Sequence, residues 1–257
     1  MDLSERGTAT GRHPWETERF RAYRGILADH GALAAHRVLD VGAGDGWFSQ
    51  SLLADLPNAE QIVCWDINYN ELELTTDDPR LVRTADAPSP GFDLVLVLDV
   101  LEHIGDPERF LEHDLRPLTS PGSPALVAVP AHPGLFGDHD RALGHHRRYT
   151  PERLLDEVAP WIDVVDHGPL FPSLVAPRAA AVALERLRAR FGADGNAQTN
   201  GDPQTLGDHG VGGWHHGPTT TRLACGVLAA DARATRRFPG VGRRLTGLSH
   251  WVFGTTR

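Results

Sequence analysis

Four residues between two predicted elements have the types and spacing to bind a charged ligand. Asp40 lies in a short apolar run, Gly42, Gly44 and Gly46 follow it, and a helical pattern begins at Trp47. Glycines accept positive φ and allow close approach of the backbone, and the helix N-terminus behind them offers free N–H groups and partial positive charge. This strand–turn–helix pattern predicts a site for a nucleotide or for a nucleotide-like cofactor that carries a carboxylate.

The spacing of the glycines separates two kinds of cofactor. A dinucleotide fingerprint is G-x-G-x-x-G, whereas this turn is G-x-G-x-G with Trp47 in place of the third dinucleotide glycine. The carboxylate of Asp40 would repel a pyrophosphate but attract a cation or a free amino group. S-adenosylmethionine (SAM) carries a sulfonium and an amino-acid head group, so we favour SAM. A nicotinamide dinucleotide, and with it an oxidoreductase, stays as the alternative.

Histidines supply the candidates for acid–base chemistry. His103 follows 92–100, the most continuously apolar run of the chain, and open α/β sheets bind ligands beyond the carboxyl ends of such strands. We rank His103, His139 and His145 in that order as general base or as part of an acceptor pocket. The alternative for His103 is a structural histidine bonded to the backbone. Glu102 either orients that histidine or is surface charge.

A loop further along the chain concentrates possible metal ligands and cationic side chains. Five ligands fall within 15 residues: His132, His139, Asp140, His145 and His146. Their spacing matches no standard zinc pattern, so we expect no metal here and predict a loop that faces the substrate.

Three residues directly follow these histidines. Arg147 and Arg148 could bind a carboxylate or phosphate of an acceptor, or form salt bridges with acidic loops. Tyr149 suits packing as well as substrate binding.

Short apolar runs alternate with helical patterns along most of the chain. The predicted strands are 37–41, 61–66, 81–84, 92–100, 125–129, 161–165 and 250–254, and the predicted helices are 15–30, 47–56, 107–115, 151–158, 174–191 and 219–237. Continuous apolarity in the fourth strand indicates burial on both faces, as in a parallel sheet covered by helices. The alternation predicts a doubly wound α/β sheet.

Three segments lack these patterns. Residues 1–14 are expected to be a flexible tail. Residues 131–149 and the Gly-, Asp- and His-rich stretch 192–217 are long for loops inside a domain. Because such loops are often functional, we expect acceptor-site loops or a lid, with Trp214 in the lid or in an ordinary loop.

Composition excludes several functions. The 257 residues include 34 acidic and 25 basic residues, and every basic residue is Arg. Without Lys there is no Schiff base and no phosphate-loop lysine, and a net charge of −9 opposes nucleic-acid binding. Two cysteines cannot form a disulfide framework, and no apolar run reaches about 18 residues. We expect a cytoplasmic protein with no secretory leader and no membrane or nucleic-acid partner.

Several motifs together resemble class I SAM-dependent methyltransferases. Residues 39–46 resemble the family's first motif, an acidic residue followed by G-x-G-x-G. Asp66, 20 residues beyond the last glycine, lies where the family places an acidic residue on the ribose hydroxyls. Residues 85–87 resemble the segment that faces the adenine, and 99–104 resemble the D-x-L-E-H run after the fourth strand.

Two further stretches extend the resemblance. Residues 12–16 with Arg19 resemble an N-terminal helix that covers the cofactor in bacterial members, and Asp140 with 144–150 resembles a D…G-H-x-R-R-Y stretch of small-molecule members. The resemblance implies a mostly parallel, seven-stranded Rossmann-like sheet with an antiparallel last strand, in a single domain over 15–257.

The resemblance also implies the activity and the cofactor contacts. SAM would give its methyl group to an oxygen or nitrogen of a small-molecule or peptide natural product and leave as S-adenosylhomocysteine. Alternatives are a SAM-fold protein with other chemistry, such as a cyclase, or an RNA or protein methyltransferase; a monomer or homodimer is expected. The implied cofactor-binding residues are Asp40, Gly42, Ala43, Gly44, Asp66, Ile67, Asp86, Ala87, Asp99 and Trp15.

Overall fold

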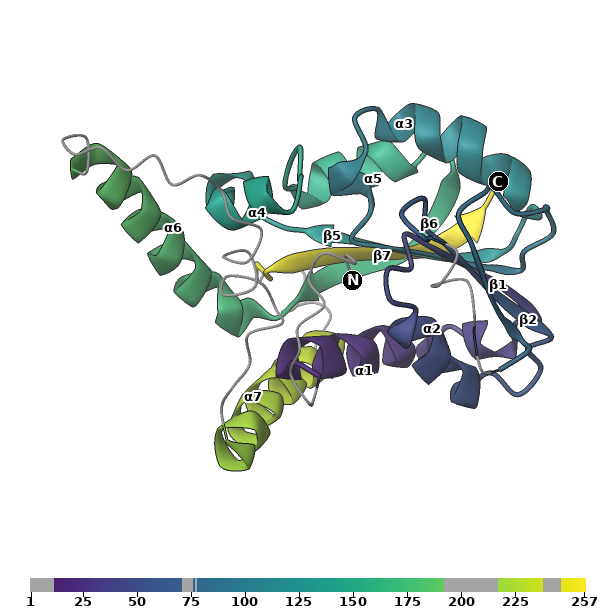
Figure 1. The fold of residues 1–257 in the computed structure, drawn as a ribbon, viewed down its shortest axis with the longest axis horizontal. Helices are drawn as coiled ribbons and strands as arrows, with labels where there is room; N and C mark the ends of the chain where they lie inside the picture. The colour runs from purple at the N-terminus through teal and green to yellow at the C-terminus, as the bar shows by residue number, and fades with distance from the viewer. Residues whose placement is uncertain (1–11, 71–75, 77, 192–216, 238–245) are drawn as a thin grey trace.

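One seven-stranded sheet organises the chain, in the order β3-β2-β1-β4-β5-β7-β6 (Figure 1). The computed structural model describes residues 12–70, 76, 78–191, 217–237 and 246–257. The first five strands pair in parallel, and β7 runs antiparallel to both of its neighbours. The predicted doubly wound sheet with an antiparallel last strand is therefore confirmed. The strands are β1 (Arg37–Val41), β2 (Gln61–Trp65), β3 (Leu81–Thr84), β4 (Leu94–Leu98), β5 (Pro124–Pro130), β6 (Ile162–Leu170) and β7 (Ser249–Thr256).

Helices cover both faces of the sheet. In Figure 1, α1, α2 and α7 lie on one face, α3 and α5 lie on the other, and α6 extends away from the sheet. The six-residue segment Phe110–Leu115 continues α3 as a π-helical turn. The helices are α1 (Pro14–Asp29), α2 (Trp47–Leu52), α3 (Pro107–Arg109), α4 (Asp138–Ala142), α5 (Pro151–Val158), α6 (Val175–Phe191) and α7 (Pro218–Arg237).

Strand β4 explains why its sequence is apolar without interruption. Leu94, Leu96 and Leu98 belong to the core beneath α1 and α2, and Val95 and Val97 belong to the core on the opposite face. Successive side chains of a strand point to opposite faces, so a strand with a hydrophobic core on each side has no polar position. The sheet is thus fixed between two cores, and its carboxyl edge is held in place.

The first turn of α1 includes residues that the sequence assigns to a flexible tail. His13 caps the helix, because its Nδ1 accepts the amide of Trp15 at 3.0 Å and Glu16 accepts the amide of His13 at 3.2 Å. Arg12 forms ion pairs with Glu16 and with Asp45 of the glycine turn. The structure therefore places 12–14 in an ordered helix start; residues 1–11 lie outside the described part.

Two loop expectations have different outcomes. Segment 131–149 contains the helix α4, so the expectation of a continuous loop is wrong there; the Asp140 carboxylate accepts the Gly137 amide at 2.9 Å and caps that helix. The expected lid, with Trp214, lies outside the described residues except for Gly217.

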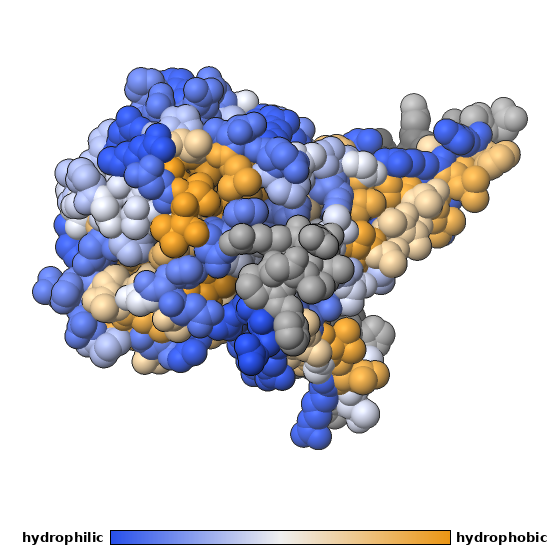
Figure 2. All heavy atoms as spheres, turned by 180° about the vertical axis from the view of Figure 1, so that it is seen from behind, coloured by the Kyte–Doolittle hydropathy of each residue, from blue (hydrophilic) through white to orange (hydrophobic). Residues whose placement is uncertain are grey.

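Two helices expose apolar side chains. Leu184, Leu187 and Phe191 are exposed on α6, and Leu223 and Val227 on α7; these helices carry orange, apolar surface in Figure 2. In the part of the chain that the structure describes, no helix is both long and apolar enough to span a bilayer.

Candidate active site

A cavity of about 930 Å³ opens at the carboxyl ends of β1, β2 and β4. Residues that follow these strands line it, and residues of α1, α4 and α6 complete the walls. Ligands of open α/β sheets bind at this edge, and the volume lies near the upper end of about 300–1,000 Å³ for small-molecule sites. The cavity has room for a cofactor and an acceptor together.

The glycine turn keeps one end of the cavity open. Gly42 has φ +61°, and a Cβ at this position would lie 2.7 Å from Cγ2 of Val100. Its amide donates to the carbonyl of Trp65 at 2.7 Å, which ties the end of β1 to β2. A larger residue here would be strained and would displace Val100, which also lines the cavity.

Asp66 is built into this turn. One carboxylate oxygen accepts the amide of Gly44 and the other accepts the amide of Asn68, both at 2.9 Å. The side chain is mostly buried and lines the cavity. Asp66 thus holds the glycine turn against the end of β2. The same carboxylate also lines the cavity.

Asp40 lies behind the turn rather than in the cavity wall. Its carboxylate accepts the hydroxyl of Ser49 at 2.7 Å, inside the protein, and it is not among the residues that line the cavity. Burial raises the pKa of Asp40 to about 6, although the Ser49 hydrogen bond opposes this. The structure therefore supports a role in fixing the start of α2 more directly than a contact with the cofactor.

The other expected cofactor residues divide into two groups. Four of them do not line the cavity: Ala43, Gly44, Asp86 and Ala87, and of these Asp86 and Ala87 are exposed. Trp15, Ile67 and Asp99 do line it. Asp99 has φ +54° and pairs with Arg19 of α1, so the end of β4 is linked to the helix that covers the cavity.

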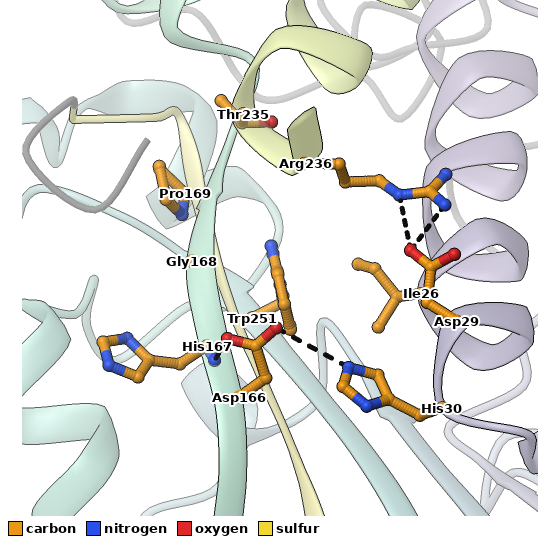
Figure 3. Close-up of a pocket in the computed structure, with 10 residues that line it drawn as sticks. All are labelled: Ile26, Asp29, His30, Asp166, His167, Gly168, Pro169, Thr235, Arg236 and Trp251. Atoms are coloured by element: carbon orange, nitrogen blue, oxygen red, sulfur yellow. Dashed lines mark hydrogen bonds and ion pairs between the residues drawn. The ribbon is translucent and has the colours of Figure 1, made fainter. Parts of the chain in front are cut away.

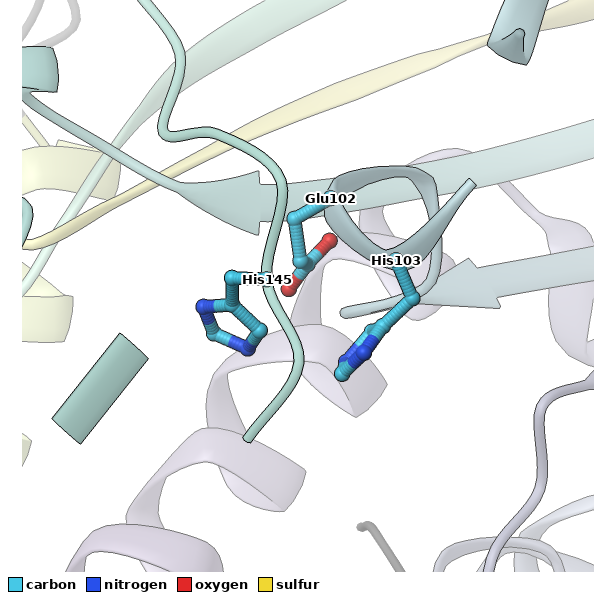
Figure 4. Close-up of side chains that lie close together, drawn as sticks. All are labelled: Glu102, His103 and His145. Atoms are coloured by element: carbon cyan, nitrogen blue, oxygen red, sulfur yellow. The ribbon is translucent and has the colours of Figure 1, made fainter. Parts of the chain in front are cut away.

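Three further side chains that line the cavity face one another (Figure 4). Glu102 and His103 come from the short turn after β4, and His145 comes from the segment after α4. The imidazole rings of His103 and His145 meet edge to face with centroids 4.6 Å apart. Glu102 is fully buried, and neither carboxylate oxygen has a hydrogen-bond partner among the described residues. Burial raises the pKa of Glu102 well above its usual range, and the nearby Asp99 adds to this.

Asp140 organises the wall behind these three side chains. Its buried carboxylate lies 3.1 Å from Nδ1 of His145 and accepts hydrogen bonds from Arg148 at 2.8 Å and Arg178 at 2.7 Å. Burial acts to raise the pKa of Asp140, but the hydrogen bonds from His145 and Arg148 outweigh it and hold the pKa below the usual range. Asp140 is therefore a charged centre that joins three segments.

The expected acceptor-binding residues are placed differently from the prediction. Arg148 lines the cavity, but its guanidinium is bonded to Asp140 and to the carbonyl of Ala131. Arg147 and Tyr149 do not line it: Arg147 donates to the carbonyl of Gly105, and the fully buried Tyr149 donates its hydroxyl to the carbonyl of Leu101 at 3.2 Å. The salt-bridge alternative fits Arg148, which pairs with Asp140, and the packing alternative fits Tyr149, whose hydroxyl has a backbone acceptor.

The five possible metal ligands of the loop do not converge. His139 and His145 line the cavity, whereas His132 and His146 do not. Burial lowers the pKa of His139, and Arg178 adds to this.

Three residues of α6 line the cavity although the sequence did not single them out: Arg178, Glu185 and Arg188. Their spacing of seven and three is the available signal, since residues so spaced share one helix face.

A second hollow is smaller and already has its polar groups paired (Figure 3). It holds about 120 Å³ between β6, α1 and α7. Arg236 pairs with Asp29 at 2.6 Å, and His30 lies 3.6 Å from Asp166. These ion pairs connect α1 to α7 and β6 and leave the large cavity as the candidate active site.

The sheet order, the glycine turn and the acidic residue after β2 are features of the class I SAM-dependent methyltransferase fold. The sequence profile of a methyltransferase domain family matches residues 15–173, so the chain belongs to that family. Gly42, Asp66 and the open cavity between them fit SAM, which supplies an activated methyl group when bound. The predictions of the family and of SAM as cofactor are confirmed.

Individual relatives support the fold more than the substrate. The chain is 30% identical over 129 residues to an uncharacterized methyltransferase of Mycobacteroides abscessus, over 45% of this chain and about half (48%) of that protein. A crystal structure of coclaurine N-methyltransferase with N-methylheliamine and S-adenosylhomocysteine is similar over 93% of this chain and 72% of that one, with 13% identity and a TM-score of 0.54. The [4+2]-cyclase SpnF is similar over 98% and 84%, with 18% identity and a TM-score of 0.50.

Proposed function

We propose that this protein transfers the methyl group of SAM to an oxygen or nitrogen nucleophile of a small molecule or peptide, as in natural-product biosynthesis. One observation carries the proposal: a single cavity joins the glycine turn at one end to the imidazoles of His103 and His145 at the other. Methyl transfer to an activated carbon needs mainly positioning of the two reactants and exclusion of water. A cavity of this form brings a bound cofactor and an acceptor together.

The cofactor end would hold SAM through the turn and its acidic partner. Gly42 leaves space beside the backbone, and Asp66 presents its carboxylate to the cavity. Trp15 and Arg19 of α1 also line the cavity. The acceptor end then receives the nucleophile opposite the transferred methyl group.

The two imidazoles would activate the nucleophile. His103 is the first candidate because it follows β4 directly. The His145 ring lies against it, with centroids 4.6 Å apart, and His139 also lines the cavity. A hydroxyl acceptor must lose its proton during transfer, and a positioned histidine speeds such a step by about 10²–10⁴. O-methylation is therefore our first choice, and methylation of an amine is the second.

The test begins with binding and continues with turnover. Calorimetric titration with SAM, S-adenosylhomocysteine and NADH should show micromolar binding of the two adenosyl ligands and none of NADH. A panel of phenols, hydroxylated natural products and amines is then screened for release of S-adenosylhomocysteine. His103→Gln should lower kcat about 10²–10⁴-fold, while the exposed His113→Gln should match wild type. Binding of NADH alone would reject the proposal in favour of an oxidoreductase.

A cyclase with the SAM fold is the second candidate, because the solved cyclase SpnF shares the fold over nearly the whole chain. Mass analysis of the product separates the two. Methyl transfer adds 14 mass units to the acceptor, by replacing H with CH₃, whereas cyclisation leaves the mass unchanged. An acceptor converted at constant mass while SAM stays intact would establish the cyclase.

A further inference from the structure

We propose that Glu102, His103 and His145 bind one divalent transition-metal ion at the acceptor end of the cavity. One ligand atom from each residue lies within 4.8 Å of the other two. Ligands at about 2.1 Å from a shared ion are roughly 3.0–3.5 Å apart, so small side-chain rotations would complete the site. Two imidazoles and one carboxylate suit zinc, manganese or iron better than magnesium or calcium.

Glu102 is the observation that points to a ligand. Its carboxylate is fully buried, both oxygens lack a hydrogen-bond partner among the described residues, and it faces the two imidazoles (Figure 4). Burial of a carboxyl group without a partner is unfavourable. A cation between Glu102 and the imidazoles would remove that cost.

His145 is already oriented as metal-binding histidines usually are. Its Nδ1 lies 3.1 Å from Asp140, and the Asp140 carboxylate accepts hydrogen bonds from two guanidiniums, so Nδ1 carries the proton of the shared hydrogen bond. Nε2 then has the lone pair and is available to an ion. A carboxylate behind the imidazole is the common support of such ligands.

The two segments that supply the ligands are fixed to each other. The amide of His146 donates to the carbonyl of Glu102 at 2.7 Å, and the hydroxyl of Tyr149 donates to the carbonyl of Leu101 at 3.2 Å. These bonds hold the turn after β4 and the segment after α4 at a set separation. The position of His145 relative to Glu102 and His103 is therefore fixed by the backbone.

Two neighbouring guanidiniums would repel a cation at this position, but each is paired with an aspartate. Arg148 and Arg19 both act on Glu102, and each is paired with an aspartate, Asp140 and Asp99 respectively. The aspartates reduce the repulsion that the guanidiniums would exert on an ion. All three proposed ligands line the cavity, so the remaining coordination positions face the acceptor, as in catalytic metal sites.

The proposed ion gives the acceptor end a chemical preference. An acceptor with a hydroxyl group, or with two neighbouring oxygens, could reach an open coordination position. His103 would then act as a ligand that places the acceptor oxygen, and this part of the inference rests on the proposed methyl transfer. The metal site itself does not.

The experiment measures metal binding on the full chain. Protein treated with a chelator and dialysed is titrated with Co²⁺, followed by visible absorption, and with Mn²⁺ and Zn²⁺ by calorimetry. We expect one ion per chain, and at least 10-fold weaker binding in Glu102→Gln and in His145→Ala. The matched control is His146→Ala, since this exposed neighbour should leave the affinity unchanged.

The outcomes separate this inference from the proposed function. No ion at a 1:1 ratio, or unchanged affinity in both ligand variants, would reject the metal site. Thermal melting of Glu102→Gln shows whether that variant is folded, and His145→Ala gives an independent test. A SAM titration of the metal-free protein examines the cofactor end on its own, so a missing metal and a missing cofactor give different results.

Discussion

The two ends of the cavity are built in different ways. At the cofactor end, neighbouring residues satisfy one another: both oxygens of Asp66 accept backbone amides, and Asp40 accepts the hydroxyl of Ser49. At the acceptor end, Glu102 has no hydrogen-bond partner among the described residues. Asp140 there joins the nearby His145 and Arg148 to Arg178, which lies 38 residues further along the chain. A cofactor common to a family can be bound by a local motif. A particular acceptor would be bound by side chains that only folding brings together, such as Glu102 and the two imidazoles.

The largest effect should come from removing the charge of Asp140. Asp140→Asn leaves Arg148 and Arg178 buried or nearly so without their anion, and breaking such a pair costs about 3–5 kcal/mol. Urea unfolding measures the loss. Asp138→Asn is the control, because Asp138 makes an exposed ion pair with Arg141, and exposed pairs contribute about 0–1 kcal/mol. A loss below about 1 kcal/mol in Asp140→Asn would show that this centre does not hold the acceptor end.

The fold should also lose stability as the pH falls, through His250 of β7, which does not line the cavity. Burial, assisted by His132, lowers the pKa of His250 to about 4. The unfolded chain binds this proton at a pKa of about 6.5, so between pH 6.5 and 4 the unfolded state holds more protons and stability decreases as the pH falls. A pKa of about 4 in the folded protein against about 6.5 in the unfolded chain corresponds to roughly 3 kcal/mol of stability.

Urea unfolding across pH 4–7 checks this, and His250→Gln should flatten the curve. The depressed pKa of Asp140 acts in a separate window, because its contribution is complete above the unfolded pKa of about 3.9 and declines only below it. An unchanged slope in His250→Gln between pH 6.5 and 4 would assign the pH response to other groups, with the half-buried His132, whose pKa burial also lowers, the next to test.

At the cofactor end, the expected effect concerns affinity. Asp66→Ala removes the acceptor of the Gly44 amide and the carboxylate that faces the cavity, so SAM should bind about 1–3 kcal/mol more weakly. Glu102→Gln, at the other end, should keep the wild-type SAM affinity. Calorimetric measurement of the SAM affinity of both variants tests whether SAM binds beside Asp66 and not beside Glu102. Equal losses in the two variants, or none in Asp66→Ala, would show that the ends are assigned incorrectly.

The comparison also explains how much the sequence could reveal. The doubly wound sheet follows from the alternation and from the uninterrupted apolar run of β4, and the antiparallel last strand follows from the family resemblance. The glycine turn lies within a few consecutive residues. The acceptor end depends on contacts across about 40 residues, such as His145 with His103. The sequence named His103 and His145 as separate candidate bases and also counted His145 among the loop histidines, whereas folding brings both imidazoles together with Glu102. The inward orientation of Asp40 was equally hidden, because only the structure places Ser49 beside it.

The smallest change in stability is expected for Tyr149→Phe, and this variant distinguishes a packing role of Tyr149 from a role in substrate binding. Its ring is fully buried, and its hydroxyl donates to Leu101 and lies 3.2 Å from Glu157. Tyr149→Phe keeps the ring and removes this bond, which should lower stability by about 0.5–1.5 kcal/mol. Because the hydroxyl faces the protein interior and not the cavity, KM for the acceptor should stay at the wild-type value. A higher KM with unchanged stability would return Tyr149 to the acceptor site and would mean that the cavity reaches deeper behind His145 than the structure shows.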